Sequence, residues 1–226
     1  MCGRFTIKFT IEEANKEFKV KKIIEKFAPS YNVAPSQKIP VIYNENGIVA
    51  LDAYKWGLIP HWAKEPNTGY KMINARIETI AEKHTYNKEL QEGRCLIPAS
   101  GFFEWKKVKD SKTPMYIHLK NREIFAFAGI SSKWKAPDGT ILKTCSIITT
   151  PPNAFTAKIH DRMPAILPKE TETEWINPEI QDKKEILAMI NTYPSKEMDA
   201  YPVSSMVNSP ANNNPKVIEP FNPIGN

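Results

Sequence analysis

The amino-acid sequence predicts an α+β protein, a single domain built around antiparallel β-sheet with short peripheral helices. Between Arg94 and Thr149 a series of β-prone runs alternates with short polar turns, which is the pattern of a strand meander. Earlier in the chain, the segment 44–47 ends in Asn-Gly and joins two apolar runs, a strong hairpin signal. A chain of 226 residues with 41% hydrophobic content is long enough for one domain with its own core.

The first quarter of the chain is expected to alternate short elements with turns. Residues 1–7 have the composition of a strand entry. Thr10 and Glu13 form the pattern of a capping box, which predicts a helix from Thr10 to about Phe18. A second short turn of helix is expected over residues 22–27, and a loop over residues 28–35, where two prolines exclude regular helix. The hairpin strands are expected at residues 39–43 and 47–56.

The remainder is predicted to contain the meander and a few helical turns. Residues 76–83 are expected to be helical, and so are residues 152–159, with Asn153 as N-cap. From Ser204 onward the chain is rich in Asn and Pro, so this tail is predicted to wrap the surface or to be partly disordered. The remaining expected elements are strands at residues 94–99, 101–108, 114–119, 124–131 and 141–150, and helical turns at 171–176 and 183–191.

Charge and cysteine content restrict the function only weakly. The net charge of +6 fits an anionic partner such as nucleic acid, but ordinary basic solubility explains it as well. The cysteines are odd in number and form no CxxC pair, which argues against a disulfide framework and a structural zinc site. Cys95 and Cys145 lie in apolar runs and are expected to be small buried residues. No run is apolar enough to span a membrane, so we expect a soluble, cytoplasmic protein.

Cys2 has the most distinctive chemistry in the chain. Once Met1 is removed, Cys2 becomes the N-terminus and carries an α-amine and a thiol on adjacent carbons, with ordinary pKa values of about 7.7–8.0 and about 8.5. Such a 1,2-aminothiol condenses with an aldehyde to a Schiff base, and the thiol then closes a five-membered thiazolidine ring. The sequence therefore points to attack on a carbonyl, either an aldehyde or an acyl group.

Two further residues are candidates for proton transfer. Glu104 lies in a run of large apolar residues, and strand alternation places it on the same face as Phe102. If that face is buried, desolvation raises the pKa of the carboxyl towards neutrality, where it can act as an acid or a base; if the face is exposed, the role disappears. His160 lies in a Pro-stopped loop after a predicted helix, which suits a general acid or base, or an ordinary surface or hydrogen-bonded histidine.

Several other polar residues are ambiguous when each is taken alone. Asn74 could orient an N-terminal amine and Arg76 could bind a phosphate, but a helix cap and a surface arginine explain the pair equally well. Arg4 and Arg162 are open to the same two interpretations.

The segments that contain these residues together resemble a known family. The set is similar to the SRAP family, the SOS response-associated peptidases, also described as abasic-site processing proteins. The resemblance covers residues 1–205, where it implies an SRAP domain of partly barrel-like β-sheet, and leaves residues 206–226 as a tail. The motifs that carry it are, in chain order, MCGRF at 1–5, NVAPSQ at 32–37, WGLIPHW at 56–62, NARIET at 74–79, IPASGFFEW at 97–105, TT at 149–150 and HDRMP at 160–164.

The resemblance implies a function and a role for each motif residue. Members of the family trap abasic sites in single-stranded DNA through the N-terminal cysteine, as a thiazolidine DNA–protein crosslink, and remove their own Met1. By motif position, Asn74 would hold the amine of Cys2, Glu104 would promote sugar ring opening and Schiff-base dehydration, and His160 would assist proton transfer. The expected DNA contacts are phosphate contacts by Arg4, Arg76 and Arg162, and further contacts, some of them by stacking or wedging, at Pro40, Trp56, Trp62 and Thr149.

The implied partner is single-stranded DNA that contains an abasic site, without a metal, a cofactor or a membrane, and the implied state is a monomer that joins the nucleoid when bound to DNA. Two other function classes stay open. Met-Cys-Gly also opens N-terminal-nucleophile amidotransferases, whose thiol attacks a glutamine amide, although here Arg4-Phe5 follows and the chain leaves no second domain to consume ammonia. A non-covalent single-stranded DNA-binding protein would explain the arginines and tryptophans but not Glu104 and His160.

Overall fold

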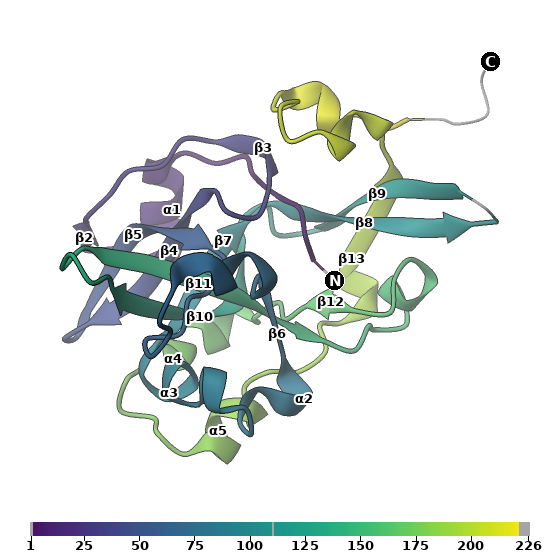
Figure 1. The fold of residues 1–226 in the computed structure, drawn as a ribbon. Coiled ribbons are helices and arrows are strands. Elements are labelled where there is room, and N and C mark those ends of the chain that lie inside the picture. The colour runs from purple at the N-terminus through teal and green to yellow at the C-terminus, as the bar shows by residue number, and fades with distance from the viewer. Residues whose placement is uncertain (1, 110, 222–226) are drawn as a thin grey trace.

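The computed structural model describes residues 2–109 and 111–221 of the chain. Its centre is a mostly antiparallel sheet in the order β12-β11-β10-β7-β4-β5-β2, with β6 paired to β11. Because β11 also pairs with β5, strands β11, β10, β7, β4 and β5 close into a barrel, which confirms the expected partly barrel-like sheet (Figure 1). The strands are β2 (Lys22–Ile23), β4 (Lys38–Glu45), β5 (Ile48–Trp56), β6 (Asn74–Arg76), β7 (Arg94–Ala99), β10 (Phe125–Lys135), β11 (Ile141–Thr150) and β12 (Met163–Pro164).

A second antiparallel sheet packs beside the barrel, in the order β13-β9-β8-β1-β3. Its two long strands, β8 and β9, form a hairpin that extends away from the barrel (Figure 1). The five strands are β1 (Phe5–Ile7), β3 (Ser30–Val33), β8 (Gly101–Val108), β9 (Ser111–Leu119) and β13 (Met198–Pro202).

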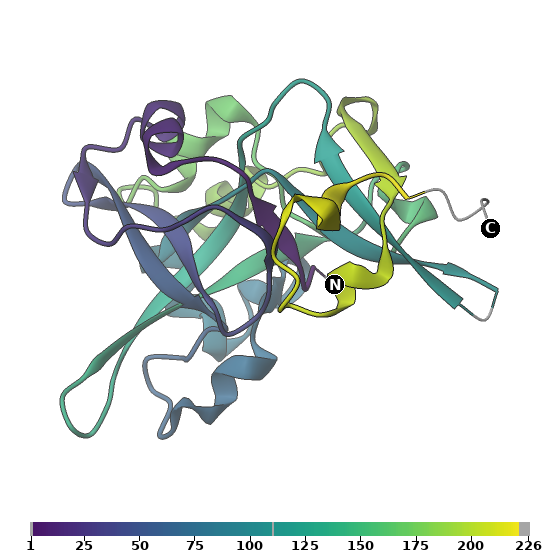
Figure 2. The same ribbon diagram turned by 90° about the horizontal axis from the view of Figure 1, so that it is seen from above.

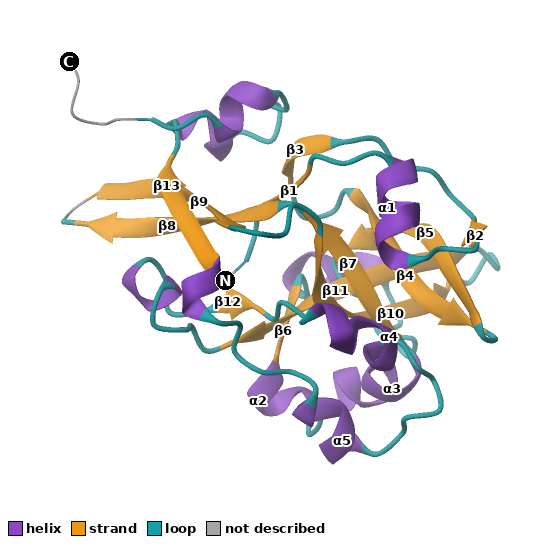
Figure 3. Ribbon diagram, turned by 180° about the vertical axis from the view of Figure 1, so that it is seen from behind, coloured by secondary structure: helices purple, strands orange, loops and turns teal. Residues whose placement is uncertain are grey.

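The helices are short and peripheral, as predicted for an α+β domain. Figure 3 shows α2, α3, α4 and α5 grouped on one side of the barrel and α1 on another. Their bounds are α1 (Ile11–Phe18), α2 (Ile77–Ile80), α3 (His84–Glu92), α4 (Glu172–Trp175) and α5 (Lys183–Ala188). Short 3₁₀ helices lie at η1 (Pro66–Lys71), η2 (Thr156–Lys158), η3 (Lys169–Thr171), η4 (Ser195–Glu197), η5 (Ser205–Asn208) and η6 (Pro215–Ile218). In the described part of the chain, none of these helices has the length and apolar character needed to cross a membrane.

An aromatic cluster joins the barrel to the second sheet. The ring centroid of Phe5 in β1 lies 5.2 Å from that of Trp56 in β5 and 5.8 Å from that of Phe127 in β10, both edge to face. Phe102 of β8 meets Phe127 at 6.0 Å. All of these side chains are fully buried, and burying one Phe contributes about 1.5–3 kcal/mol. The paired strands β1 and β8 are therefore held rigidly against the barrel at the point where the N-terminus enters.

Most predicted elements before the meander, and the meander itself, are confirmed. Helix α1 follows Thr10, whose hydroxyl accepts the amide hydrogen of Glu13 at 3.2 Å while the Glu13 carboxylate accepts that of Thr10 at 2.7 Å. The turn between β4 and β5 places Asn46 and Gly47 at φ 53° and 85°, the left-handed values that Asn-Gly adopts readily. The five predicted meander strands correspond to β7, β8, β9, β10 and β11.

Three segments differ from the prediction. Residues 22–27 do not form a helix, because the backbone of Lys22 pairs with Ala50 of β5 and forms β2. Residues 28–35, expected to be a loop, contain β3, which pairs with β1. Helix α3 is absent from the prediction, and α2 covers only part of the expected residues 76–83. In the first two segments, pairing with a distant strand decides the conformation, and local residue preferences do not predict such pairing.

Residues 204–221 run back over the second sheet. The side-chain amide of Asn32 in β3 donates to the carbonyls of Val207, Ser209 and Asn212, at 3.3, 2.9 and 2.8 Å. Val207 and Val217 are fully buried in a small cluster with Phe103, Tyr116 and Val203. This C-terminal segment therefore covers the face of β8 that points away from the barrel.

Candidate active site

The N-terminal residues reach the site through the pairing of β1 with β8. The two strands are antiparallel, with Phe5 opposite Phe102. Continuing this register towards the N-terminus places Gly3 opposite Glu104, with Cys2 the next residue along, and the charge of Glu104 acts on the Cys2 thiol. Cys2 is fully buried, and its burial, together with the charge of Glu104, raises the pKa of the thiol above its usual range. The thiol is therefore neutral in this environment and needs a base in order to react.

Glu104 is a buried carboxyl, with 2% of its surface exposed. It shares the inward face of β8 with Phe102, while Phe103 and Trp105 lie in the cluster on the other face, which confirms the alternation predicted from sequence. Burial raises the pKa of Glu104 to about 7, and the negative charge of Asp161 acts in the same direction. At neutral pH such a carboxyl is populated in both forms and can donate or accept a proton.

His160 faces Glu104 from the loop that follows η2. Its Nε2 lies 3.6 Å from Oε2 of Glu104. Its Nδ1 lies 3.1 Å from the backbone nitrogen of Arg162, on the side of the ring away from Glu104. Burial lowers the pKa of His160, and the exposed carboxylate of Asp161, 2.9 Å from Nδ1, opposes that shift. The imidazole and the carboxyl are thus placed to exchange a proton.

Asn74 contacts Cys2 directly. It begins β6, which runs parallel to β11 with Asn74 opposite Ile147. Its Nδ2 donates to the backbone carbonyl of Cys2 at 2.8 Å. Its Oδ1 is buried and has no hydrogen-bond partner among residues 2–109 and 111–221. Because buried polar atoms are normally paired, this oxygen is an acceptor position for an N–H group next to Cys2.

The structure therefore gathers the four predicted catalytic residues in one place. Cys2 precedes β1, Glu104 lies in β8, Asn74 begins β6 and His160 lies in a loop. The cluster contains a thiol, a side-chain amide and a carboxyl beside an imidazole, groups of the kinds that attack on a carbonyl requires.

Arg4 is oriented by the C-terminal segment. Its Nη1 donates to Oδ1 of Asn32 at 2.7 Å and to the carbonyl of Val207 at 2.5 Å. These bonds use part of the donor set of the guanidinium, which carries five N–H groups. A phosphate contact by Arg4 would therefore use the remaining donors.

Arg162 is engaged by an acidic residue of α2. It forms a two-pronged ion pair with Glu78, and its Nη2 also donates to the carbonyl and the hydroxyl of Thr149, at 2.7 and 3.1 Å. Thr149 is fully buried, so it orients Arg162 and presents no surface of its own. Arg76, by contrast, is exposed at the end of β6 and makes no ion pair within the described part of the chain.

Of the residues expected to stack or wedge against bases, Trp62 is accessible and the other two are not. Trp56 is fully buried, and its indole N–H donates to the carbonyl of Ile73 at 2.9 Å. Pro40 is buried in β4 opposite Ala53. Both side chains belong to the barrel, so the predicted base contacts at Pro40 and Trp56 are not available in this structure. Trp62 is 50% exposed.

Sequence reasoning missed three residues that shape this region: Asn32, Glu78 and Asp161. Each lies within a segment that carries the family resemblance. The two acidic residues are also close to arginines in the sequence: Glu78 follows Arg76 by two positions, and Asp161 directly precedes Arg162. The motifs could thus have drawn attention to them. The partner of Glu78 is 84 positions away, however, and nothing local indicates that contact.

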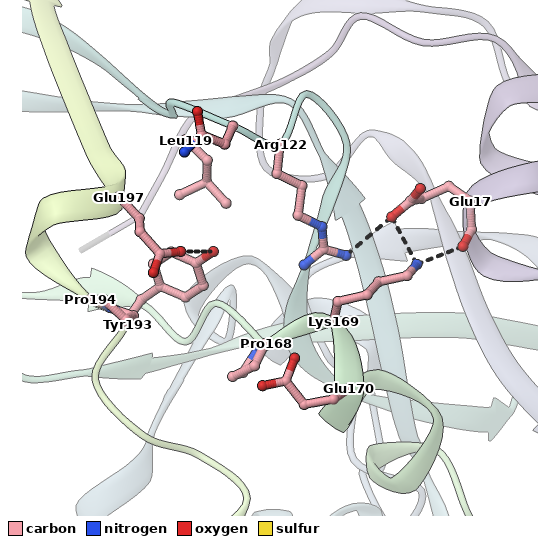
Figure 4. Close-up of a pocket in the computed structure, with 10 residues that line it drawn as sticks. Glu17, Leu119, Arg122, Pro168, Lys169, Glu170, Tyr193, Pro194 and Glu197 are labelled. Carbon is pink, nitrogen blue, oxygen red and sulfur yellow. Dashed lines mark hydrogen bonds and ion pairs between the residues drawn. The ribbon is translucent and has the colours of Figure 1, made fainter.

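A separate pocket surrounds Arg122 (Figure 4) and has a volume of about 630 Å³. Arg122 and Lys169 supply its positive charge, and both are paired with Glu17, at 3.3 and 2.8 Å. Lys169 also pairs with the buried Glu172 at 3.0 Å. Because these charges are neutralised in place, the pocket is a structural ion-pair network rather than a second anion site.

The chain is similar to known proteins over almost its whole length. The chain matches the model of the SOS response associated peptidase (SRAP) family over residues 1–210. It is 48% identical over 222 residues to the abasic site processing protein YoqW of Bacillus subtilis (strain 168), covering 97% of this chain and 99% of the relative. It is 31% identical over 228 residues to the abasic site processing protein YedK of Escherichia coli (strain K12), covering 97% and 100%. The crystal structure of a protein from Bacteroides thetaiotaomicron superimposes with a TM-score of 0.87 at 29% identity, covering 97% of this chain and all of that chain.

Proposed function

The chain belongs to the SOS response-associated peptidase (SRAP) family, and from this premise we propose that it captures abasic sites in single-stranded DNA as a covalent thiazolidine on Cys2. The names of its relatives YoqW and YedK support abasic DNA as the substrate. The observation that carries the proposal is the buried Glu104, with its pKa of about 7, beside Cys2 and His160.

The proposal requires removal of Met1, which lies outside the described residues. While Met1 is attached, the nitrogen of Cys2 is an amide nitrogen and cannot form an imine. Hydrolysis of the Met1–Cys2 bond consumes one water, releases methionine and leaves an α-amine on Cys2. Glu104 is the base that we propose for activation of this water, because burial leaves its carboxyl basic at neutral pH.

Capture begins at the ring-opened abasic sugar, which presents an aldehyde at C1′. The amine of Cys2 attacks this carbon and forms a carbinolamine. Protonated Glu104 then gives its proton to the departing hydroxyl, water leaves and an iminium forms. Glu104, now a carboxylate, takes the proton of the Cys2 thiol, and the sulfur attacks the same carbon to close the ring. The net reaction converts aldehyde and aminothiol into thiazolidine and water, and Glu104 returns to its starting form.

Two neighbouring groups support these steps. The Nε2 of His160 faces Glu104 and can exchange a proton with it before capture begins, so that Glu104 starts as an acid and then, as a carboxylate, acts as a base. Asn74 donates to the carbonyl of Cys2, and its Oδ1, which has no partner among the described residues, would accept a hydrogen from the newly exposed amine. A fixed amine attacks with far less loss of entropy than a free one.

DNA binding is proposed to rest mainly on phosphate contacts. Arg76 is exposed and free to bind a phosphate, while Arg4 and Arg162 would use donors not occupied by their present partners. Trp62 is the accessible stacking side chain among those predicted. We further propose that the protein acts as a monomer without metal or cofactor, in the cytoplasm and on the nucleoid when bound.

Intact mass spectrometry before and after incubation with an abasic oligonucleotide tests the proposal. The expected masses are the chain without methionine, and then that chain plus the oligonucleotide minus one water. A non-covalent DNA-binding protein would give no such adduct under denaturing conditions, and an amidotransferase would hydrolyse glutamine instead. Either result would overturn the covalent mechanism.

A further inference from the structure

Two hairpins of this protein place lysines directly opposite each other. In the β8–β9 hairpin Lys107 pairs with Lys112, and in the β10–β11 hairpin Lys133 pairs with Lys143. Figure 2 shows these hairpins projecting on opposite sides of the molecule. Like charges directly opposite each other destabilise two paired strands. A negative or aromatic group near the two lysines would offset this repulsion.

The β10–β11 pair has its compensation within the protein. The Nζ of Lys143 lies 2.6 Å from the carboxylate of Asp52, whose side chain is fully buried. Lys133 lies over the ring of Tyr43, with its Nζ 5.7 Å from the ring centroid. This hairpin therefore needs no external anion.

Among the residues that the structure describes, the β8–β9 pair has no such compensation. Its hairpin also carries Lys106 and Lys109, and all four lysines are exposed. None of them makes an ion pair with any residue in the described ranges 2–109 and 111–221, whereas Lys22, Lys38, Lys88, Lys143 and Lys169 all do. The hairpin thus concentrates positive charge that no ion pair within these ranges balances.

The hairpin is anchored at its base and leads directly out of the candidate active site. The indole N–H of Trp105 donates to Oδ1 of Asn208 in the C-terminal segment at 2.9 Å, which holds one face of β8. Glu104 lies on the same strand as Lys107, about 10 Å away at 3.3 Å per residue. At the other strand, the charge of Lys112 reaches His160, where it adds to the lowering of the pKa that burial causes.

We propose that the β8–β9 hairpin, through Lys106, Lys107, Lys109 and Lys112, binds the phosphates of the DNA strand beside the captured lesion. This inference rests on the proposed function, because that function brings a DNA strand to Glu104. A polyanion supplies the countercharge that the Lys107–Lys112 pair does not find among the described residues, and each phosphate neutralised by a lysine releases condensed counterions. The anchored base keeps Lys106, on the face of Glu104, and Lys107 and Lys112, on the other face, at fixed positions along the hairpin that the strand follows.

The test compares two double variants with the same loss of charge. K107Q/K109Q removes two charges from the β8–β9 hairpin and spares Lys112, which acts on His160. K133Q/K135Q, in the opposite hairpin, is the matched control. Binding is measured at 50 and 200 mM salt with single-stranded oligonucleotides that contain a tetrahydrofuran abasic analogue, which lacks the aldehyde and cannot be captured covalently.

We expect the salt slope of K107Q/K109Q to fall by about 1.4, because each phosphate that a lysine neutralises on a single strand adds about 0.7 to the slope. Over the fourfold rise in salt, this variant then loses about sevenfold less affinity than the wild type, and the control behaves as the wild type. An unchanged slope in K107Q/K109Q, or an equal fall in the control, overturns the proposal. Thermal melting of both variants in the absence of DNA verifies that they are folded.

Oligonucleotide length provides an independent check. Extending the strand on one side of the analogue is expected to increase the affinity of the wild type, and to do so much less for K107Q/K109Q. Equal gains for both proteins contradict the hairpin contact. The proposed function is judged separately, by adduct formation with a natural abasic site: a wild type that forms no adduct but shows the expected slopes refutes covalent capture and leaves the hairpin as a DNA-binding surface.

Discussion

The carboxylate of Glu104 lies 3.6 Å from Nε2 of His160, and this contact is the centre of the site. Burial raises the pKa of Glu104 to about 7 and lowers that of His160, so that near neutral pH the imidazole is neutral while the carboxyl is populated in both forms. A carboxyl and a neutral imidazole side by side can pass a proton between them. The pair therefore suits a reaction in which one carboxyl must first give a proton and then take one.

Replacing Glu104 with Gln is expected to slow crosslinking by about 10²–10⁴-fold, the usual contribution of general acid–base catalysis. The rate is measured as the appearance of a gel-stable adduct with an abasic oligonucleotide. Glu89→Gln is the matched control, since Glu89 is also buried and lies 3.0 Å from a histidine, His61, outside the site. Equal rates in the wild type and Glu104→Gln would remove Glu104 from the mechanism.

The free energy of unfolding is expected to depend on pH because of the buried carboxyl of Glu104. The pKa of Glu104 is about 7 in the folded protein and ordinary, near 4.5, in the unfolded chain. The folded state therefore binds the proton more tightly, so stability is fully present below pH 4.5, falls as pH rises towards 7 and then stays low. Glu104→Gln is expected to be more stable than the wild type at pH 8 by roughly 1–3 kcal/mol, and by much less at pH 4.5. Urea unfolding at both pH values measures this, and a pH-independent difference would contradict it.

The two nucleophiles of Cys2 can be separated by substitution. Cys2→Ala and Cys2→Ser keep an N-terminal amine but lose the thiol, so each is expected to form an imine that does not close into a thiazolidine. Neither variant should give an adduct on a denaturing gel, while reduction with borohydride should trap the imine. Cys95→Ala, a change at another buried thiol, is expected to crosslink normally. A stable adduct with Cys2→Ala and no reductant would show that another nucleophile acts.

Glu78 is expected to restrain DNA binding, because it occupies the guanidinium of Arg162. Glu78→Gln removes the competing charge and leaves Arg162 available to a phosphate. We expect tighter binding to single-stranded DNA and a salt slope steeper by about 0.7. The exposed Glu82→Gln serves as the control for the loss of one negative charge. If both variants bind DNA alike, the ion pair does not limit Arg162.

The C-terminal segment is expected to stabilise the fold through its buried valines. Val207 is fully buried against the second sheet, so Val207→Ala should lower the free energy of unfolding by roughly 1–3 kcal/mol. Val108, at the end of β8, is 44% exposed, and Val108→Ala should change the free energy of unfolding by less than about 0.5 kcal/mol. Urea unfolding of the two variants provides the comparison, and equal losses would show that the segment is not packed as described.

Much of this protein could be predicted from local sequence. The capping box at Thr10, the Asn-Gly turn and the strand meander each depend on residues within a few positions of one another, and all three are present in the structure. The inward position of Glu104 followed from alternation along one strand, because the period of two is set by the backbone itself. The chemistry of Cys2 could also be predicted from the sequence, because the amine and the thiol of an N-terminal cysteine belong to a single residue.

What the sequence alone determined was therefore the set of local elements and the identity of the reactive groups. Tertiary structure decided which groups meet: the parallel pairing of β6 with β11 brings Asn74 to Cys2, and barrel closure buries Trp56 instead of exposing it to bases. It also decided that Arg162 pairs with Glu78 and that residues 28–35 contain a strand. The physical reason is that hydrogen bonds between strands, and ion pairs between distant side chains, depend on partners that no local window contains.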